Sequence, residues 1–352
     1  MIKEGLSLSN NTFIGKPMVN VTTQTEEKFI IPPNKNNKQI QKIKEIIHSC
    51  DLDKSGNIFS LTETEDRRIA SGGGDGNIVI SSYDANEREW HLDIYQKKAH
   101  NYSVMSLCSL KGNKLVSGGI DCSIKVWKIS NRYIEQIKEL KEHTNWVYQV
   151  IPLSNERFAS CSNDMTVKIW KNDDAYDECL STLKHNNCVN SILQLKGKEI
   201  LVSSCGNSDH SSNRGVSFWN INNYTQQHFI KGYCVDWFTH MIELSNGNIA
   251  LSSDVKPYPI VIIDGSSFQI KTEIPLIEHL PFCSSLCVFN QQSFIYAYKG
   301  IFLQISNENC SIMFMARGGK LNGYFGIIPL EDGKYLAIQN GNKLSIVKPY
   351  YN

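Results

Sequence analysis

The sequence lacks long apolar runs and carries almost no net charge. Its 352 residues include 36 Lys and Arg against 35 Asp and Glu, and a net charge of +1 gives no long-range attraction to nucleic acid or an anionic membrane. No run of about 18 apolar residues is present, so we expect no transmembrane helix. The first residues, MIKEGLSLSNNTF, also lack the apolar core of a secretion signal.

The cysteines do not follow the pattern of a disulfide scaffold or a zinc site. There are 11 of them, an odd number, scattered singly along a chain much longer than disulfide-stapled miniproteins. Cys283 and Cys287 lie close together, but no second pair with zinc-finger spacing accompanies them. Free thiols indicate a reducing compartment, which we expect to be the cytoplasm, with the nucleus as the alternative. We expect no cofactor.

Two segments repeat the same four residue types at the same spacings. The distances are 17 residues from His to Ser, 4 from Ser to Asp and 6 from Asp to Trp, and the second segment follows the first by 43 residues. The two sets are His100, Ser117, Asp121 and Trp127, then His143, Ser160, Asp164 and Trp170. A period of about 40 to 45 residues is typical of four-stranded propeller blades.

These segments resemble the repeats of the WD-repeat family, which carry a Gly-His pair, a Ser or Thr, an Asp in a turn and a terminal Trp-Asp pair. The sequence departs from that pattern before each His, where Ala99 or Glu142 stands, and after each Trp, where Lys128 or Lys171 stands. The resemblance implies that each four-residue set is a buried hydrogen-bond network, which joins the outer strand and a turn to the inner strands. It is strongest over residues 70–171 and weak after about residue 255.

The rest of the chain fits the same architecture less regularly. Short alternating apolar runs, separated by NG, DG or KG turns, predict further strands. We therefore predict an all-β fold, a seven-bladed WD-repeat β-propeller over residues 38–352, with an N-terminal arm over residues 1–37. Segment 38–50 is expected to supply the outer strand of the last blade, because the resembling family closes its ring in this way. Closure removes a free sheet edge.

The first repeated set has a second interpretation, because His, Ser and Asp are also the residue types of an acyl-transfer triad. A nucleophile has to be exposed beside an oxyanion hole, and a single copy suffices. Here the same set recurs in two successive units, each ending in Trp. We therefore interpret both sets as structural and expect no enzymatic activity.

A calcium loop is the main competing motif. Asp51, Asp53 and Ser55 stand at positions 1, 3 and 5 of such a loop, and Gly56 stands at position 6. Position 12 is Thr62 instead of the bidentate Glu, and no helix-like segment follows. A Gly-Asn turn entering the first blade is the favoured interpretation, and the three oxygen-bearing residues remain a weak metal-site alternative.

The repeat alignment also predicts a partner-binding face. Residues just before each innermost strand, and those two positions further on, should lie at one mouth of the central channel. Large aromatic residues typically anchor binding hot spots, although they also pack blade rims. The candidates are Trp146, Tyr148, Trp237, Phe282, Met105, Ser103 and Asn190.

The function predicted from these patterns is a non-catalytic protein–protein interaction scaffold or adaptor, a subunit of a larger complex. It would bind proteins or peptides at one propeller face, with no membrane partner and no direct contact with nucleic acid. A Ca²⁺-responsive binding module and an RNA-associated complex subunit are the alternatives. A fold alone does not decide among them.

Overall fold

The computed structural model describes the chain over thirteen segments: residues 41–47, 58–84, 89–173, 179–206, 213–233, 240–252, 260–274, 285–298, 301–310, 312–317, 327–330, 335–340 and 343–348. By internal contacts the chain divides into units 1–36 and 37–352, and all the described segments belong to the second unit. Every regular element in them is a β-strand, which confirms the predicted all-β architecture. Within these segments no helix is long and apolar enough to cross a membrane.

The described strands form seven four-stranded antiparallel sheets. From the inside outward, the first three are β2 (Ile58–Glu63), β3 (Ile69–Gly73), β4 (Ile78–Asp84) and β5 (Glu89–Gln96); β6 (Val104–Leu110), β7 (Lys114–Gly119), β8 (Ile124–Ile129) and β9 (Ile134–Leu140); and β10 (Val147–Leu153), β11 (Arg157–Ser162), β12 (Thr166–Lys171) and β13 (Cys179–Lys184).

The next three sheets follow the same order. They are β14 (Val189–Gln194), β15 (Ile200–Cys205), β16 (Gly215–Asn220) and β17 (Thr225–Lys231); β18 (Met241–Glu243), β19 (Ile249–Ser252), β20 (Ile260–Ile263) and β21 (Ile270–Ile274); and β22 (Ser285–Asn290), β23 (Ser293–Tyr298), β24 (Ile301–Ser306) and β25 (Ile312–Arg317). The remaining sheet contains β26 (Ile327–Leu330), β27 (Tyr335–Asn340), β28 (Lys343–Lys348) and β1 (Gln41–Ile47).

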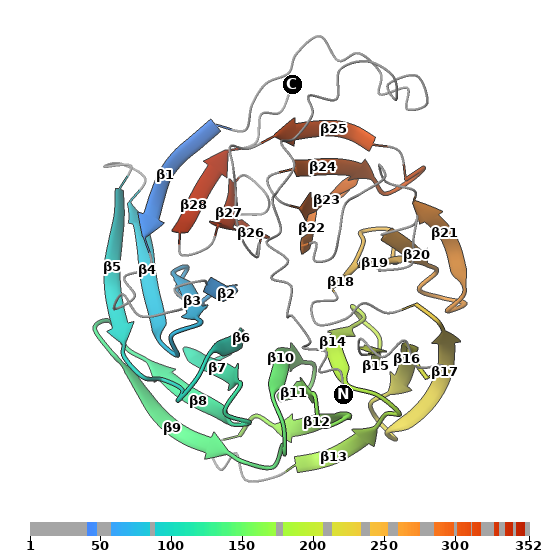
Figure 1. Ribbon diagram of the computed structural model, residues 1–352, viewed down its shortest axis with the longest axis horizontal. Coiled ribbons are helices and arrows are strands. Elements are labelled where there is room, and N and C mark those ends of the chain that lie inside the picture. Colours follow the sequence, from blue (N-terminus) through green and yellow to red (C-terminus); the bar gives the residue numbers. More distant parts are fainter. Residues whose placement is uncertain are drawn as a thin grey trace, which may run out of the picture. The chain divides into compact units, whose positions relative to one another are not determined.

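Within residues 37–352 the sheets stand around a common axis as the blades of a β-propeller (Figure 1). The innermost strands β2, β6, β10, β14, β18, β22 and β26 are neighbours in this order, and β26 also contacts β2. The ring is therefore continuous through contacts between the innermost strands. The outer strand of the last sheet is β1, which pairs antiparallel with β28 from Gln41 opposite Lys348 to Ile47 opposite Lys343. Strands from both ends of the ring's sequence thus share one sheet.

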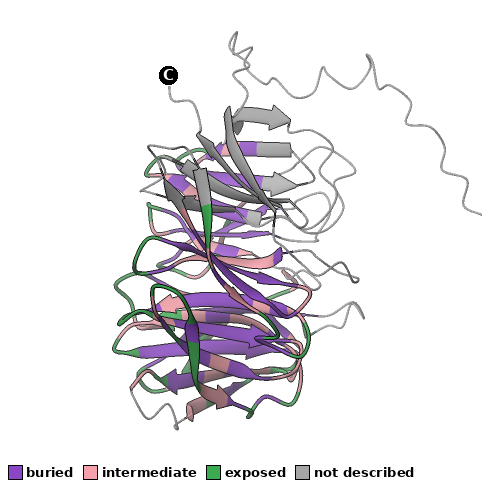
Figure 2. Ribbon diagram, turned by 90° about the vertical axis from the view of Figure 1, so that its left-hand side faces the viewer, coloured by how far each residue is buried: buried purple, intermediate pink, exposed green. Residues whose placement is uncertain are grey.

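The core lies between adjacent blades, so the middle strands are covered on both faces. Each of the six residues of β11 is buried, as are the five of β3. Figure 2 shows buried residues along the strands and exposed residues mainly in the connections between them. Trp127 on β8 packs in one cluster with Ile78 and Ile80 of the preceding blade. Because these strands are covered on both faces, their burial does not alternate from residue to residue, and the polar residues that they contain need hydrogen-bond partners.

A side-chain hydrogen bond joins successive blades close to the axis. An innermost strand is a sheet edge, where some backbone N–H groups have no ladder partner. β2, β6 and β10 each contain a register shift at the same place, just before Ser60, Ser106 and Gln149. Each of these side chains accepts a hydrogen bond from a backbone N–H of the next innermost strand. The bonds are Ser60 Oγ to Leu107 N at 2.7 Å, Ser106 Oγ to Val150 N at 3.0 Å and Gln149 Oε1 to Ile192 N at 2.7 Å. We call them the inter-blade clips.

Ser106→Ala tests the energetic weight of a clip. The substitution leaves the Val150 N–H without its acceptor in a buried position, and we expect the free energy of unfolding to fall by about 1–3 kcal/mol. Urea denaturation measures it. Ser109→Ala is the matched control, because Ser109 lies on the same strand, half-buried, and should cost less than about 0.5 kcal/mol. Equal losses for the two variants would contradict a role for the clip.

Candidate functional site

The structure brings together the four residues of the first repeated set. The imidazole of His100 lies between Ser117 and Asp121, with Nε2 at 2.7 Å from Ser117 Oγ and Nδ1 at 2.9 Å from Asp121 Oδ1. The indole N–H of Trp127 donates to the same Ser117 Oγ at 2.9 Å. Because His100 precedes the innermost strand and Trp127 lies on the third, the network ties a connection between blades to the middle of the sheet.

The second set repeats this geometry in the next blade. His143 Nε2 lies 2.7 Å from Ser160 Oγ, His143 Nδ1 lies 2.7 Å from Asp164 Oδ2, and Trp170 Nε1 donates to Ser160 Oγ at 2.8 Å. Asp164 also accepts the backbone N–H of Thr144, which fixes the connection that carries the histidine. Buried polar groups stabilise a fold when all of them are paired, and here each member has a partner.

The burial of both serines argues against a nucleophilic role for them. Ser117 and Ser160 have no exposed surface, and the side chains of His100 and His143 have none either. Each serine oxygen already accepts an indole N–H and lies against an imidazole. A carbonyl substrate therefore has no path to these oxygens, and the triad-like residue types serve to hold the blade together.

The acids of the two sets are held in the charged form. Burial alone would raise the pKa of Asp121, but the hydrogen bond and the charge of His100, together with the Asn101 N–H, hold that pKa well below its ordinary value. Asp164 has a lowered pKa for the same reasons, with His143 and Thr166 as its partners. The carboxylates therefore stay acceptors across the physiological pH range.

The next blade contains a three-membered version of the network. His185 Nε2 lies 2.7 Å from Ser203 Oγ, which also accepts the Trp219 indole N–H at 3.0 Å. The other ring nitrogen of His185 is 3.1 Å from the carbonyl oxygen of Leu183, in the place where the other two blades have a carboxylate. Burial lowers the pKa of His185 to about 4, and the Leu183 carbonyl only partly opposes this shift.

The predicted mouth residues fall into two groups. Trp237 and Phe282, like the calcium-loop candidates Asp51, Asp53 and Ser55, lie outside the described residues. Trp146, Tyr148, Met105, Ser103 and Asn190 lie within them, at or near the starts of β6, β10 and β14. Because strands alternate in direction, these starts share one end of the sheets with the β3–β4, β7–β8 and β11–β12 turns. We call this end the mouth face.

Trp146 and Tyr148 are in direct contact at the start of β10. Their rings meet edge to face, with centroids 6.4 Å apart and an interplanar angle of 87°. Tyr148 Oη donates to Asn163 Oδ1 at 3.3 Å, and the Asn163 backbone N–H donates to the Trp146 carbonyl at 2.9 Å. Both aromatic residues are half-buried, and burial raises the pKa of Tyr148, with smaller effects of Cys188 and Cys161. The pair is therefore held in place while part of it faces solvent.

Ser103 and Asn190 are used to hold neighbouring segments. Ser103 Oγ donates to the Gly74 carbonyl of the preceding blade at 3.1 Å, and the buried Asn190 amide donates to the Gly206 carbonyl at 3.0 Å. Met105 is half-buried on β6. Of the five described mouth candidates, the aromatic pair therefore offers the broadest apolar contact surface.

The mouth face also carries two exposed apolar side chains that the repeat alignment did not single out. Tyr102, in the β5–β6 connection, is 64% exposed, and Met165, in the β11–β12 turn, is 45% exposed. The His185 backbone N–H donates to the Met165 carbonyl at 2.9 Å, so that turn is anchored to the next blade. Tyr102 directly precedes an alignment position, and a wider window would have included it.

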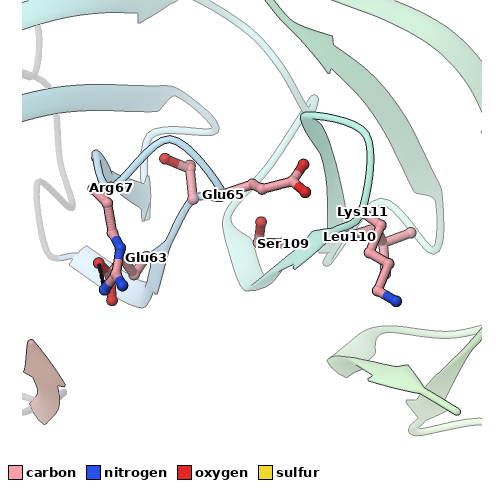
Figure 3. A pocket seen from close by; sticks show the side chains of 7 residues that line it. Glu63, Glu65, Arg67, Ser109, Leu110 and Lys111 are labelled. Carbon is pink, nitrogen blue, oxygen red and sulfur yellow. Dashed lines mark hydrogen bonds and ion pairs between the residues drawn. The ribbon is translucent and has the colours of Figure 1, made fainter. Parts of the chain in front are cut away.

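A cavity of about 380 Å³ lies at the opposite end of the sheets, between the β2–β3 and β6–β7 turns (Figure 3). Its polar groups largely satisfy one another: Arg67 pairs with Glu63 at 3.1 Å, and Glu65 accepts the Asn113 backbone N–H at 2.7 Å. Figure 3 shows Glu65 extending toward the β6 side of the cavity. Acidic and basic side chains are mixed here, so the lining selects no single ligand chemistry. In the described part of the chain, no group of three or more His, Cys, Asp or Glu is arranged to hold a metal ion.

The two hydrogen-bonded sets lie in segments that also match a known protein family. The family described as WD domain, G-beta repeat matches residues 93–128 and 134–171. The chain carries WD40 repeats. The solved WD40 β-propeller domain of Doa1 superposes with a TM-score of 0.66, covering 87% of this chain and 97% of that one at 16% identity. That likeness establishes the fold, and the predicted propeller is confirmed.

Two curated proteins match a short part of the chain in sequence. Each is named "Probable cytosolic Fe-S cluster assembly factor", one from Schizosaccharomyces pombe with 34% identity and one from Schizosaccharomyces japonicus with 28% identity, both over 74 residues. These matches cover 20% and 21% of this chain. The chain spans only 12% of the length of either relative, so the similarity is confined to a small part of both proteins.

The network of His185, Ser203 and Trp219 has no acidic member, and we predict that it makes the free energy of unfolding depend on pH. The pKa of His185 is about 4 in the folded state against about 6.5 in the unfolded chain, so the unfolded chain takes up the proton first. We expect the free energy of unfolding to decrease as the pH falls from about 6.5 to 4. His185→Asn should be less stable at pH 7 but flatter over this range. Denaturation at a series of pH values measures both, and parallel curves for the two proteins would refute the assignment.

Proposed function

We propose that this chain is a non-catalytic scaffold that binds segments of other proteins at its mouth face, as a subunit of a larger complex. WD40 propellers are suited to this role because they present loops at the ends of a rigid ring of sheets. The proposal of a non-catalytic role is supported by the burial of Ser117 and Ser160, which removes the most enzyme-like residue sets from solvent.

The observation that carries the proposal is the contact between Trp146 and Tyr148. The edge-to-face pair is oriented by the Tyr148–Asn163 hydrogen bond, yet both rings keep exposed surface at the mouth face. Aromatic side chains that are rigid before binding lose little conformational entropy on contact with a partner. A half-exposed Trp beside a Tyr therefore forms a suitable anchor for an apolar side chain of an extended peptide.

The opposite end of the sheets supports the same conclusion, because its polar groups are used to join blades. Arg157 donates to Glu199 at 2.8 Å and to the Ile221 carbonyl at 2.7 Å, both in the next blade. Glu243 accepts the Lys196 backbone N–H of the preceding blade at 2.6 Å. These bonds stiffen the ring on which the mouth face is carried, and leave fewer polar groups at this end to bind a partner.

The cytoplasm is the compartment we propose. All eight cysteines in the described segments are free thiols, four of them buried, which suits a reducing environment. The two curated proteins that match a short part of the chain are named as cytosolic proteins. Their assembly role is not carried over, because the shared region is a small part of their length.

Affinity purification of the full chain and its Trp146→Ala variant tests the mouth-face proposal. We expect the partners captured by the wild-type chain to be reduced at least about tenfold by the variant, since loss of a hot-spot aromatic costs about 2 kcal/mol or more in binding. Tyr133→Ala is the matched control, because Tyr133 is 59% exposed in the β8–β9 turn at the opposite end of the sheets. Equal recovery from all three proteins, each checked for an unchanged melting temperature, would overturn the proposal.

A further inference from the structure

The outer strand β17 is the most open edge among the outer strands whose burial is described. Five of its seven residues are exposed and none is buried. By contrast β9, β13 and β21 each contain a buried residue, as does β5 at Ile94. The neighbouring β13 exposes only two of its six residues. β17 therefore stands out as an accessible strand.

β17 also lacks the charges that usually protect a sheet edge. Its sequence, TQQHFIK, has a single charged residue, Lys231, at its last position. Outer strand β9 has two glutamates and a lysine within its seven residues, and β21 has a lysine and a glutamate within five. Charged side chains at an exposed edge oppose pairing with another chain, and β17 is without them over Thr225–Ile230.

An aromatic side chain adds contact area beside this edge. Phe229 is 38% exposed, and its ring lies over Gly215 of β16, where a Cβ atom would stand only 2.6 Å from the ring. A side chain at position 215 would collide with this ring and with the Ile230 carbonyl, so the glycine makes room for Phe229 beside the sheet. His228 is held near Gln269 of the next blade at 3.2 Å, so the middle of the strand is positioned from both blades.

We propose that two copies of this chain associate through β17, which pairs antiparallel with β17 of the second copy to form a continuous eight-stranded sheet. The only ladder partner of β17 in the described strands is β16, so its outer edge has backbone groups available for a second ladder. Pairing centred on His228 sets Thr225 opposite Lys231, so no like charges face each other. The two Phe229 rings then flank the two-fold axis.

A second copy fits this edge better than an unrelated strand. An isologous contact satisfies the same edge on both partners at once and then closes, whereas a foreign strand would leave its own outer edge open. The absence of charge over six consecutive residues makes the strand self-complementary, since a charged strand would face its own charges around a two-fold axis. The dimer would carry two mouth faces, and its formation does not depend on the function proposed for them.

Sedimentation-velocity measurements on the full chain from about 1 to 200 µM test the proposal. The wild-type chain should show a concentration-dependent species of twice the monomer mass. Gln227→Lys places two lysines on diagonal positions about 7–8 Å apart across the new ladder, and we expect it to weaken dimerisation at least tenfold. Gln227→Glu should weaken it similarly, and an equimolar mixture of the two variants should recover a dimer of mixed composition.

Gln136→Lys is the matched control, because Gln136 is exposed on β9, the outer strand of another blade. It should dimerise like the wild type. A wild-type chain that stays monomeric over the whole concentration range overturns the proposal. So does a dimer that persists in Gln227→Lys, or one that the mixture of oppositely charged variants fails to restore.

Discussion

The ring depends on what happens to the inner edge of each sheet. Near the axis, some backbone N–H groups of each innermost strand have no partner within the sheet. A buried N–H group without an acceptor lowers the free energy of unfolding. The inter-blade clips solve this locally, since Ser60, Ser106 and Gln149 each accept an N–H of the next blade. The same bond that satisfies an edge also sets the position of one blade relative to the next. Apolar packing between sheets then fills the space that this arrangement leaves.

The networks of His, Ser, Asp and Trp lie further from the axis than the inter-blade clips, at the second and third strands of their sheets. They hold the connection between blades against the second and third strands, as Ser117 and Ser160 each receive a Trp indole and face a His. Because every member is paired and the His, Ser and Trp members are buried, these polar residues contribute to the fold and not to chemistry at the surface. We therefore expect binding sites where side chains are held in place by the ring and still have exposed surface.

Two surfaces meet that description, and they are physically different. At the mouth face, Trp146 and Tyr148 present fixed aromatic area, and Tyr102 and Met165 are exposed at the same end of the sheets, which suits side-chain recognition. At the outside of the ring, β17 presents backbone hydrogen-bonding groups along a neutral edge, which suits strand pairing. One surface lies at the ends of strands and the other along a strand, so one chain can use both at the same time.

The repeating unit, its all-β character and the members of both four-residue sets could be predicted from the residue pattern alone. These depend on strand and turn lengths within about 27 consecutive residues of one blade, and a local spacing such as His100 to Trp127 can be read along the chain. The mouth candidates were only partly resolved in this way: Trp146 and Tyr148 form a pair, whereas Ser103 and Asn190 bond to loops.

The inter-blade clips and the exposed surfaces could not be predicted from the residue pattern, because they depend on how the blades pack against one another. The acceptors at equivalent places are two serines and a glutamine, and each partner is a backbone group in a different blade, about 40 or more residues away. The exposure of Tyr102, Met165 and β17 likewise depends on how neighbouring blades cover one another. The residue types do not reveal such contacts, because a backbone N–H is present at almost every position. The burial of a side chain depends on packing across the whole ring.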